Sequence, residues 1–584
     1  MDRKSLIILA VAVCMVLLMF RLVDHFFPPK PMPLLPPQAT NMEAALSNAP
    51  AALPPPASIA PATAQTQPSA PEHILTASNA DLICFFTSRG GGLKTVDLKR
   101  YPAVIGRRAA PFSETNLASL NHNAPLPVLA VVGDGLTGDD DFTLTRADGA
   151  LRAEKLLANG LRVVKEFEIG ANHLLNARLW LENTSAQPLN VPSRQLIVGT
   201  ATAIGPLDDP TAMGAFWYNG IKAQDIKDSW FANRTLGCIP GVPRGQYQEG
   251  AGNVVWAAVH NQFFALAVIL TNPAPAVVID KIRVPAPDTN GPTNSMTALL
   301  TNGYQTALVY PATNLAPGQS LQTAFVIYAG PKEYKRLAEI AQRMGNDLDA
   351  IMDFGGVFGY FSKLLLISMN GLHNIGLPYG LTIIVITIII KFLFWPLTNA
   401  STKSQKRMQA LQPQLKAIAD KYKDDAAKRN EKTMEFYKQH KLNPLGSCLP
   451  TLLQMPVFFG FYYMLRGAVE LRGAHFLWVF DLSQPDTVAS LGGFPVNPLP
   501  LIMGATQLWQ SHMMPPSPGM DPAQQKLMRY MPLLFIIFFY RMAAGLTLYW
   551  TVQNLLSILQ LRLTSASGDP AAAPAPPAPV KKKM

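Results

Sequence analysis

Long apolar runs near the N-terminus and beyond residue 375 constrain this chain more than any other feature of its sequence. One run covers residues 6–20, and five others lie at 377–397, 449–465, 498–514, 527–540 and 546–561. A helix needs about 20 mostly apolar residues to cross a bilayer, and local thinning accommodates somewhat shorter ones. We therefore expect a membrane protein with an α-helical bundle of six spans, the first being an N-terminal transmembrane anchor over residues 1–27.

The segment between the first run and the other five has the composition of a tether followed by a soluble domain. Thirteen prolines lie within residues 28–71, which predicts an extended Pro/Ala-rich tether over residues 28–73. Short β-branched and apolar segments then recur between turn signals, which predicts a large antiparallel β-sandwich over residues 74–352 with a helical stretch from Pro331 onward. The clearest predicted strands are 82–87, 162–169, 174–181, 254–259, 263–270 and 321–329.

The distribution of charge predicts how these segments are oriented. Eleven Lys and Arg against five acidic residues lie in 398–447, and Lys581, Lys582 and Lys583 form a basic tail. Basic residues beside apolar runs mark the cytoplasmic side of a membrane, so the net charge of +11 needs no nucleic-acid partner.

If residues 355–372 also crossed, the basic loop would lie outside the cytoplasm. We therefore predict an interfacial amphipathic helix at 353–376, a five-helix membrane core at 377–563 and a basic cytoplasmic tail at 564–584. Both termini are then cytoplasmic, and the β domain lies in the periplasm of a bacterial inner membrane.

Polar residues inside the apolar runs predict a hydrated groove. Lys391 lies within the run 377–397, and a cation in hydrocarbon costs about 3 kcal/mol or more unless it faces water. Thr387 precedes it by four residues and so shares its helix face. The other runs contribute Gln454, Thr506, Gln507, Gln510, Thr551, Gln553, Asn554 and Ser557. Snorkelling of the lysine and ordinary hydrogen bonding between helices remain the alternatives.

The basic loop predicts a cytoplasmic helical hairpin over residues 398–447. Met408, Leu411, Leu415, Ile418 and Tyr422 repeat at intervals of three and four, which is typical of an amphipathic helix. Lys403, Lys406 and Arg407 flank this apolar stripe, and a second helical segment covers 431–439. The hairpin either lies on anionic lipid and sets orientation, or docks incoming chains or ribosomes.

Enzymatic motifs fail to appear. Gly90-Gly91-Gly92 lacks the ending of a phosphate loop, and no HExxH or GxSxG sequence occurs. Four cysteines without metal-ligand spacing predict neither a metal site nor a disulfide scaffold, although Cys84 and Cys238 would be able to pair in an oxidising compartment. We expect no catalysis, cofactor or metal.

Several motifs, in order along the chain, resemble those of the YidC membrane-protein insertases. They are Phe86 to Gly92, Tyr328 to Lys332, Ile386 to Thr398, Met408 to Pro413, Tyr437 to Gly446, Leu449 to Pro456 and Asp521 to Lys526. The resemblance covers the chain apart from its tether and tail. It implies the long Gram-negative form, with a twisted periplasmic β-sandwich and a groove that is open to the cytoplasm and lipid.

The resemblance also implies roles for individual residues. Lys391 matches the basic position of the groove, where relatives carry Arg. The implied substrate contacts are Gln454, Met455, Phe458, Trp550 and Asn554, with weaker matches at Thr387 and Gln507. The implied partners are nascent membrane proteins, the Sec translocon and the ribosome, and no small-molecule ligand is expected.

Two other classes of protein remain open at this point. A secondary transporter or channel for a small anion would also use an intramembrane cation and polar helix faces. A mutarotase-like enzyme anchored to the membrane would need a converging His and acid pair in the β domain.

Overall fold

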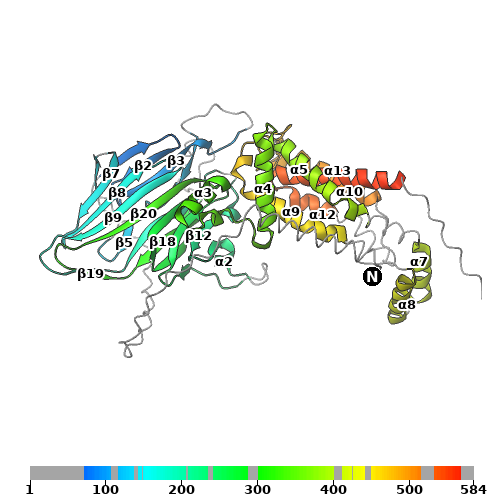
Figure 1. Ribbon diagram of the computed structural model, residues 1–584, viewed down its shortest axis with the longest axis horizontal. Helices are drawn as coiled ribbons and strands as arrows, with labels where there is room; N and C mark the ends of the chain where they lie inside the picture. Colours follow the sequence, from blue (N-terminus) through cyan, green and yellow to red (C-terminus); the bar gives the residue numbers. More distant parts are fainter. Residues whose placement is uncertain are drawn as a thin grey trace, which may run out of the picture.

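A computed structural model describes residues 71–106, 116–136, 142–147, 149–205, 208–234, 241–286, 300–399, 401, 411–423, 425–440, 449–513, 530 and 532–566. A half made of strands and a half made of helices lie side by side (Figure 1). The predicted anchor, almost the whole tether and nearly all of the basic tail fall outside the described residues. Cys238 does too, so the question of its pairing with Cys84, which the sequence leaves open, stays open.

All strand pairings among the described residues are antiparallel. The largest sheet has the order β13 (Ala223–Lys227), β12 (Gly214–Tyr218), β15 (Val254–His260), β16 (Phe264–Ala274), β20 (Ser320–Pro331), β9 (Leu174–Asn183), β8 (Leu161–Ile169), β7 (Ala150–Leu156) and β6 (Thr143–Ala147). A second has the order β14 (Gln246–Glu249), β17 (Ala276–Pro285), β18 (Leu300–Tyr310), β11 (Arg194–Ala201) and β5 (Val131–Gly133). Smaller sheets contain β1 (Ile74–Ser78), β2 (Leu82–Thr87), β3 (Gly92–Pro102) and β4 (Leu117–Leu120), and the pair β10 (Leu189–Val191) and β19 (Thr313–Leu315).

All six predicted strands are present, as β2, β8, β9, β15, β16 and β20. Strand β9 shows why they were visible in the sequence. Its residues Leu175, Ala177, Leu179 and Leu181 are buried, while the side chains between them are more exposed. Alternate side chains of a strand point to opposite faces, so burial on one face leaves a period of two in the sequence.

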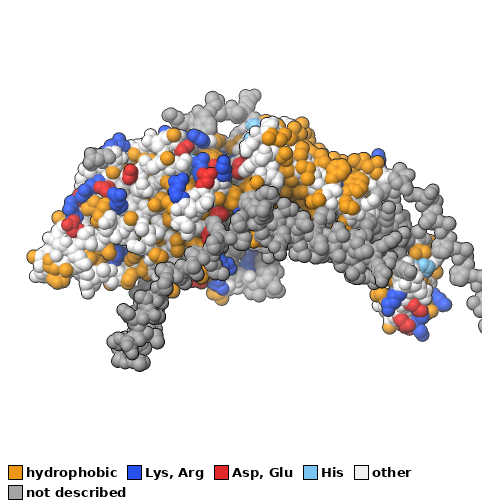
Figure 2. Space-filling view, in the orientation of Figure 1, with side chains coloured by type: hydrophobic (Ala, Val, Ile, Leu, Met, Phe, Trp, Pro, Cys, Tyr) orange, Lys and Arg blue, Asp and Glu red, His pale blue; other side chains and the backbone are white. Residues whose placement is uncertain are grey.

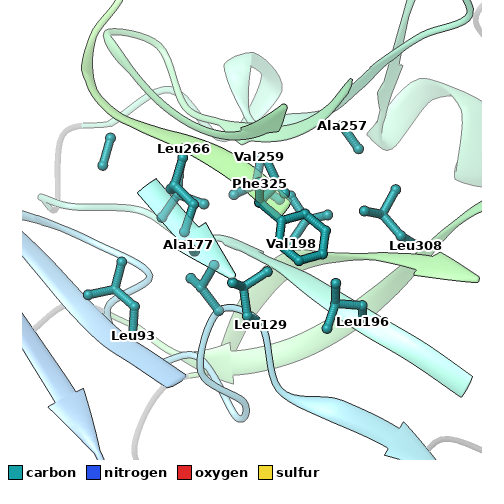
Figure 3. Packing of buried hydrophobic residues seen from close by; sticks show 14 of the residues in the cluster. Leu93, Leu129, Ala177, Leu196, Val198, Ala257, Val259, Leu266, Leu308 and Phe325 are labelled. Carbon is teal, nitrogen blue, oxygen red and sulfur yellow. The ribbon is translucent and has the colours of Figure 1, made fainter. Parts of the chain in front are cut away.

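The core of the strand half lies between the two largest sheets, which pack face to face (Figure 3). Val198 and Leu308 come from the second sheet, and Val259, Leu266 and Phe325 from the first. All five side chains are buried. This arrangement is the sandwich that the sequence predicts.

Gly90 and Gly91 form a turn before β3, and a buried lysine donates to it. Gly90 and Gly91 have φ values of 68° and 54°, a region that favours glycine. The Lys165 ammonium donates to the Gly90 carbonyl oxygen at 2.6 Å and lies 4.7 Å from the centroid of the Phe142 ring. Lys165 is fully buried, and this burial lowers its pKa from 10.5 to about 7.

The buried Lys165 predicts a pH dependence of stability. Because its pKa is lower in the folded state, the unfolded chain binds more protons between about pH 7 and pH 9, and stability should rise with pH in this range. Lys165→Met should reduce that rise by up to about 1.4 kcal/mol per pH unit. Chemical denaturation at several pH values measures the slope, and the exposed Lys222→Met is the control. An unchanged slope in Lys165→Met would contradict the assignment.

The helices are α2 (Asp228–Ala232), α3 (Tyr334–Met344), α4 (Gly359–Asn374), α5 (Tyr379–Leu393), α7 (Gln412–Lys421), α8 (Ala426–Gln439), α9 (Leu449–Gly467), α10 (Pro498–Met513), α12 (Pro532–Phe539) and α13 (Ala544–Ala566). The prediction of a helical stretch from Pro331 was wrong in two respects: the helix starts later than predicted, and it is interrupted. Strand β20 continues to Pro331, and α3 ends at Gly345, whose φ of 63° provides a left-handed cap. A separate 3₁₀ helix, Leu348–Met352, follows.

Helices α5, α9, α10, α12 and α13 occupy the five apolar runs predicted after residue 375, and α4 occupies the predicted interfacial segment. None of the helices within the described ranges combines the length and apolar character needed to cross a bilayer. The number of spans stays a prediction.

Charged side chains join the strand half to the helical half. Arg466, at the end of α9, donates to Asp209 at 2.8 Å and to Thr211 at 2.6 Å. Arg472 donates to the backbone carbonyls of Pro102 and Ala103 at 2.6 and 2.9 Å. These contacts tie the end of α9 directly to the β domain.

Candidate functional site

Helix α13 is the element around which the predicted groove residues gather. It contacts α5, α9 and α10. Tyr549, Gln553, Ser557 and Gln560 follow one another at intervals of four, four and three residues, and therefore lie on one face of the helix. Trp550 and Asn554 lie on the adjacent face. These positions let one helix direct polar side chains to its three neighbours α5, α9 and α10.

Lys391 lies in α5 and its side chain points to α13. Its ammonium donates to Ser557 Oγ at 2.8 Å, and Ser557 donates in turn to the Gln553 carbonyl oxygen at 2.8 Å. Lys391 is only 6% exposed. Ser557 thus positions the lysine, a role that the sequence reasoning missed although it noted Ser557 as a polar residue.

Thr387 does not extend the polar face of Lys391. Its hydroxyl donates to the Ile383 carbonyl oxygen at 2.7 Å, one turn earlier in the same helix. A threonine in a helix commonly satisfies its hydroxyl in this way. The sequence interval placed Thr387 on the correct face but did not predict its hydrogen bond.

Gln454 of α9 is held by two residues of α13. It donates to the Tyr549 hydroxyl, and its carbonyl oxygen accepts from Gln553 Nε2 at 3.1 Å. Met455, the next residue, is 42% exposed. The amide therefore faces the bundle, while its neighbour does not.

Trp550 joins the aromatic and polar parts of the site. Its ring nitrogen donates to Gln507 Oε1 of α10 at 3.0 Å. Its ring meets the Phe458 ring edge-on, with centroids 5.0 Å apart. Asn554, one turn further, donates to Thr506 Oγ1 at 3.3 Å. Polar side chains of α10 therefore form hydrogen bonds with α13, which is the pattern of ordinary hydrogen bonding between helices.

One polar residue that the sequence reasoning did not single out, Gln560, extends the same face. Gln560 donates to Thr398 Oγ1 at 2.8 Å and is buried. Its interval of three from Ser557 was the signal that would have found it. Polar side chains thus link α13 to α5, α9, α10 and the segment that contains Thr398. They are Lys391, Gln454, Gln507, Gln553, Asn554, Ser557 and Gln560.

The predicted docking helix is only partly within the described residues. Lys403, Lys406, Arg407 and Met408 lie outside them. Leu411 precedes α7 and is half-buried, and Leu415 is buried, as is Phe436 of α8. Helices α7 and α8 contact each other, so the described part of the predicted loop is a helical hairpin.

The β domain contains a His and acid pair enclosed by its own residues. His260 Nε2 lies 3.0 Å from Asp225 Oδ1, and His260 Nδ1 lies 3.2 Å from the Asn261 carbonyl oxygen. Lys227 pairs with the same Asp225. The His260 side chain is 3% exposed. Both nitrogens of the ring therefore face protein oxygens.

Two solved structures are similar to the chain at low TM-scores. One, titled an active YidC insertase with the first transmembrane domain resolved, is 17% identical, covers 85% of this chain and 93% of its own, and has a TM-score of 0.33. The other, a putative aldose 1-epimerase from Escherichia coli K12, is 15% identical, covers 44% of this chain and 99% of its own, and has a TM-score of 0.27. At these scores neither likeness bears on the site.

Family models and a sequence relative bear on the whole chain. The YidC periplasmic domain model matches residues 76–367, and the 60Kd inner membrane protein model matches residues 371–569. A relative from Syntrophus aciditrophicus named membrane protein insertase YidC is 30% identical, over 96% of this chain and 98% of its own. The prediction of an insertase with a periplasmic domain is thereby confirmed. The chain belongs to the YidC family of inner-membrane protein insertases.

Proposed function

We propose that Lys391 attracts the acidic or polar outer segment of a nascent membrane protein while the polar face of α13 guides it. The observation that carries the proposal is the surroundings of the lysine. Within the described part of the chain, the buried Lys391 ammonium bonds to a neutral hydroxyl and has no carboxylate partner. An unbalanced buried charge is costly. A substrate carboxylate would remove that cost, which favours its entry.

In this proposal, the hydrogen bonds between helices are those that the site makes before a substrate enters. Gln454 bonds to Tyr549 and Gln553, and Trp550 bonds to Gln507. Such bonds are worth about 0.6 kcal/mol each in a membrane. The backbone and polar side chains of a substrate can therefore replace them at little net cost. Apolar substrate segments then move sideways into lipid, driven by about 0.8 kcal/mol per buried methylene.

We also propose the membrane topology that the charges predict: six spans, cytoplasmic termini and a periplasmic β domain over 74–352. The position of α7 and α8 supports it, because they lie at the end of the helical half away from the strands (Figure 1). Charged side chains gather on them, whereas the neighbouring helices carry an apolar surface (Figure 2). The hairpin within 398–447 would then meet ribosomes, anionic lipid or the Sec translocon.

Crosslinking tests the proposed substrate path. A photoreactive side chain at Gln454 or Trp550 should crosslink a ribosome-stalled nascent membrane protein several-fold more than one at Ile389, which is 56% exposed on α5. The reason is that Gln454 of α9 bonds to the polar face of α13 and Trp550 lies on the adjacent face of that helix, while Ile389 is an exposed apolar residue. Equal crosslinking at the three positions would contradict the path. Gel analysis of the crosslinked nascent chain is the measurement.

A further inference from the structure

A short hairpin beside the helical half has no role in the proposed insertion path. Strands β21 (Ala489–Leu491) and β22 (Phe494–Val496) are joined by Gly492 and Gly493, whose φ values are 57° and 85°. Two glycines at positive φ form the tight turn that suits a two-residue hairpin. Leu491 and Phe494 are directly paired at its tip and are 71% and 60% exposed.

Hydrogen bonds and a ring contact hold the hairpin at the helix ends that face the β domain. Tyr540, directly after α12, donates to the Pro495 carbonyl oxygen and contacts the Phe494 ring, with centroids 5.2 Å apart. Asn497, directly before α10, donates to the Tyr540 carbonyl oxygen at 2.6 Å. The preceding loop reaches the β domain, because Asp481, Gln484 and Arg472 line one small cavity together with Ala103 and Val104. The hairpin therefore lies at the periplasmic end of α10 and α12.

We infer that the β21–β22 hairpin inserts its tip into the outer leaflet of the membrane, at the boundary between headgroups and acyl chains. Residues 487–501 contain no charged side chain. The two helices beside the hairpin, α10 and α12, also carry exposed apolar residues, which include Leu501, Ile537 and Phe538.

Two residues close to the hairpin in its hydrogen-bond network or in sequence favour lipid over a protein partner. Trp478 is 37% exposed, and its ring nitrogen donates to Asp486 at 3.1 Å. Arg541 is exposed directly after Tyr540. An aromatic ring bonded to Asp486, before the start of the hairpin, and a cation beside Tyr540 match the headgroup level of a bilayer, where the cation meets phosphate. The hairpin would then fix the depth of the helix ends from which it projects.

Depth-dependent quenching tests the inference with the full chain in proteoliposomes. A genetically encoded fluorescent side chain is placed at Leu491, at Ile537 on α12, or at Ile221, which is 86% exposed on the β domain. At Leu491 we expect quenching by lipid with a nitroxide near its headgroup to exceed quenching by aqueous iodide at least about threefold. At Ile221 the order should reverse.

The inference rests on the proposed placement of α12 in the membrane. The Ile537 probe tests that placement separately from the insertion of the hairpin. If lipid nitroxide fails to quench Ile537, the proposed span is wrong. If it quenches Ile537 but iodide quenches Leu491 as it does Ile221, the hairpin inference alone is wrong. Shielding of Leu491 from iodide in native membranes, but not in pure lipid vesicles, would also overturn it and would indicate a protein partner.

Discussion

Lys391→Ala is expected to reduce insertion of membrane proteins with acidic outer segments by about tenfold or more, because a hydrogen bond to a charged group is worth about 1.5–3 kcal/mol. About 1.4 kcal/mol corresponds to a factor of ten. Substrates without charge in that segment should insert nearly as well as before. The measurement is protease protection of the outer segment after synthesis with proteoliposomes that contain the variant.

Three comparisons make the charge of Lys391 the tested quantity. Lys391→Arg should retain most activity, because it keeps the positive charge. Lys363→Ala changes another lysine, which lies over the Tyr334 ring and away from Ser557, and should leave insertion unchanged. Neutralising the substrate, Asp to Asn, should lower wild-type insertion without lowering that of Lys391→Ala further. If the neutralised substrate lowers insertion by Lys391→Ala as much as it lowers insertion by the wild type, the two charges do not interact.

A structural loss at Lys391 can be separated from a functional one. The alanine removes the donor to Ser557 Oγ, and the serine still donates to the Gln553 carbonyl oxygen. The variant should therefore unfold close to the wild-type temperature. A large drop in that temperature would mean that Lys391 holds the bundle together rather than attracting substrate.

The strands could be predicted because burial on one face leaves a local signal. Strand β9 alternates along its whole length, and β2 was predicted with its observed bounds. Pairing between distant strands leaves no such signal. Strand β20 lies between β16 and β9, and β5 lies beside β11, and the sequence contains nothing local from which either neighbour follows. The helix after β20 was predicted to start three residues early, at Pro331, and the break at Gly345 between α3 and the 3₁₀ helix was missed.

The polar residues of the helical half could be predicted, but their partners could not. Lys391, Gln454 and Asn554 stand out because each interrupts an apolar run. Which polar group each one meets depends on how α5, α9 and α10 rotate against α13, and the sequence interval within one helix does not contain that rotation. Ser557 therefore emerged as the partner of Lys391 only from the packed helices.

Trp256→Ala is expected to destabilise the β domain by about 3–5 kcal/mol, the range for removing a large aromatic side chain from a core. Trp256 of β15 is fully buried and donates to the Asn346 carbonyl oxygen at 2.7 Å. Its ring stacks on Tyr218, with centroids 5.6 Å apart. It belongs to the buried cluster that also contains Leu337 of α3 and Ile351, so the lost contacts lie where the sandwich meets the helices that follow it. Thermal unfolding in detergent measures the change.

Trp256→Phe separates packing from hydrogen bonding at the same position. It keeps most of the ring volume and the stacking on Tyr218 but leaves the Asn346 carbonyl oxygen without its donor, at a cost of about 1–3 kcal/mol. If packing at the junction dominates, the phenylalanine variant should lie much nearer to wild type than the alanine variant. Equal losses would instead assign the stability of the junction to the bond with Asn346. Because Asn346 lies between α3 and the 3₁₀ helix, that result would make the chain direction after α3 depend on one hydrogen bond from the sandwich.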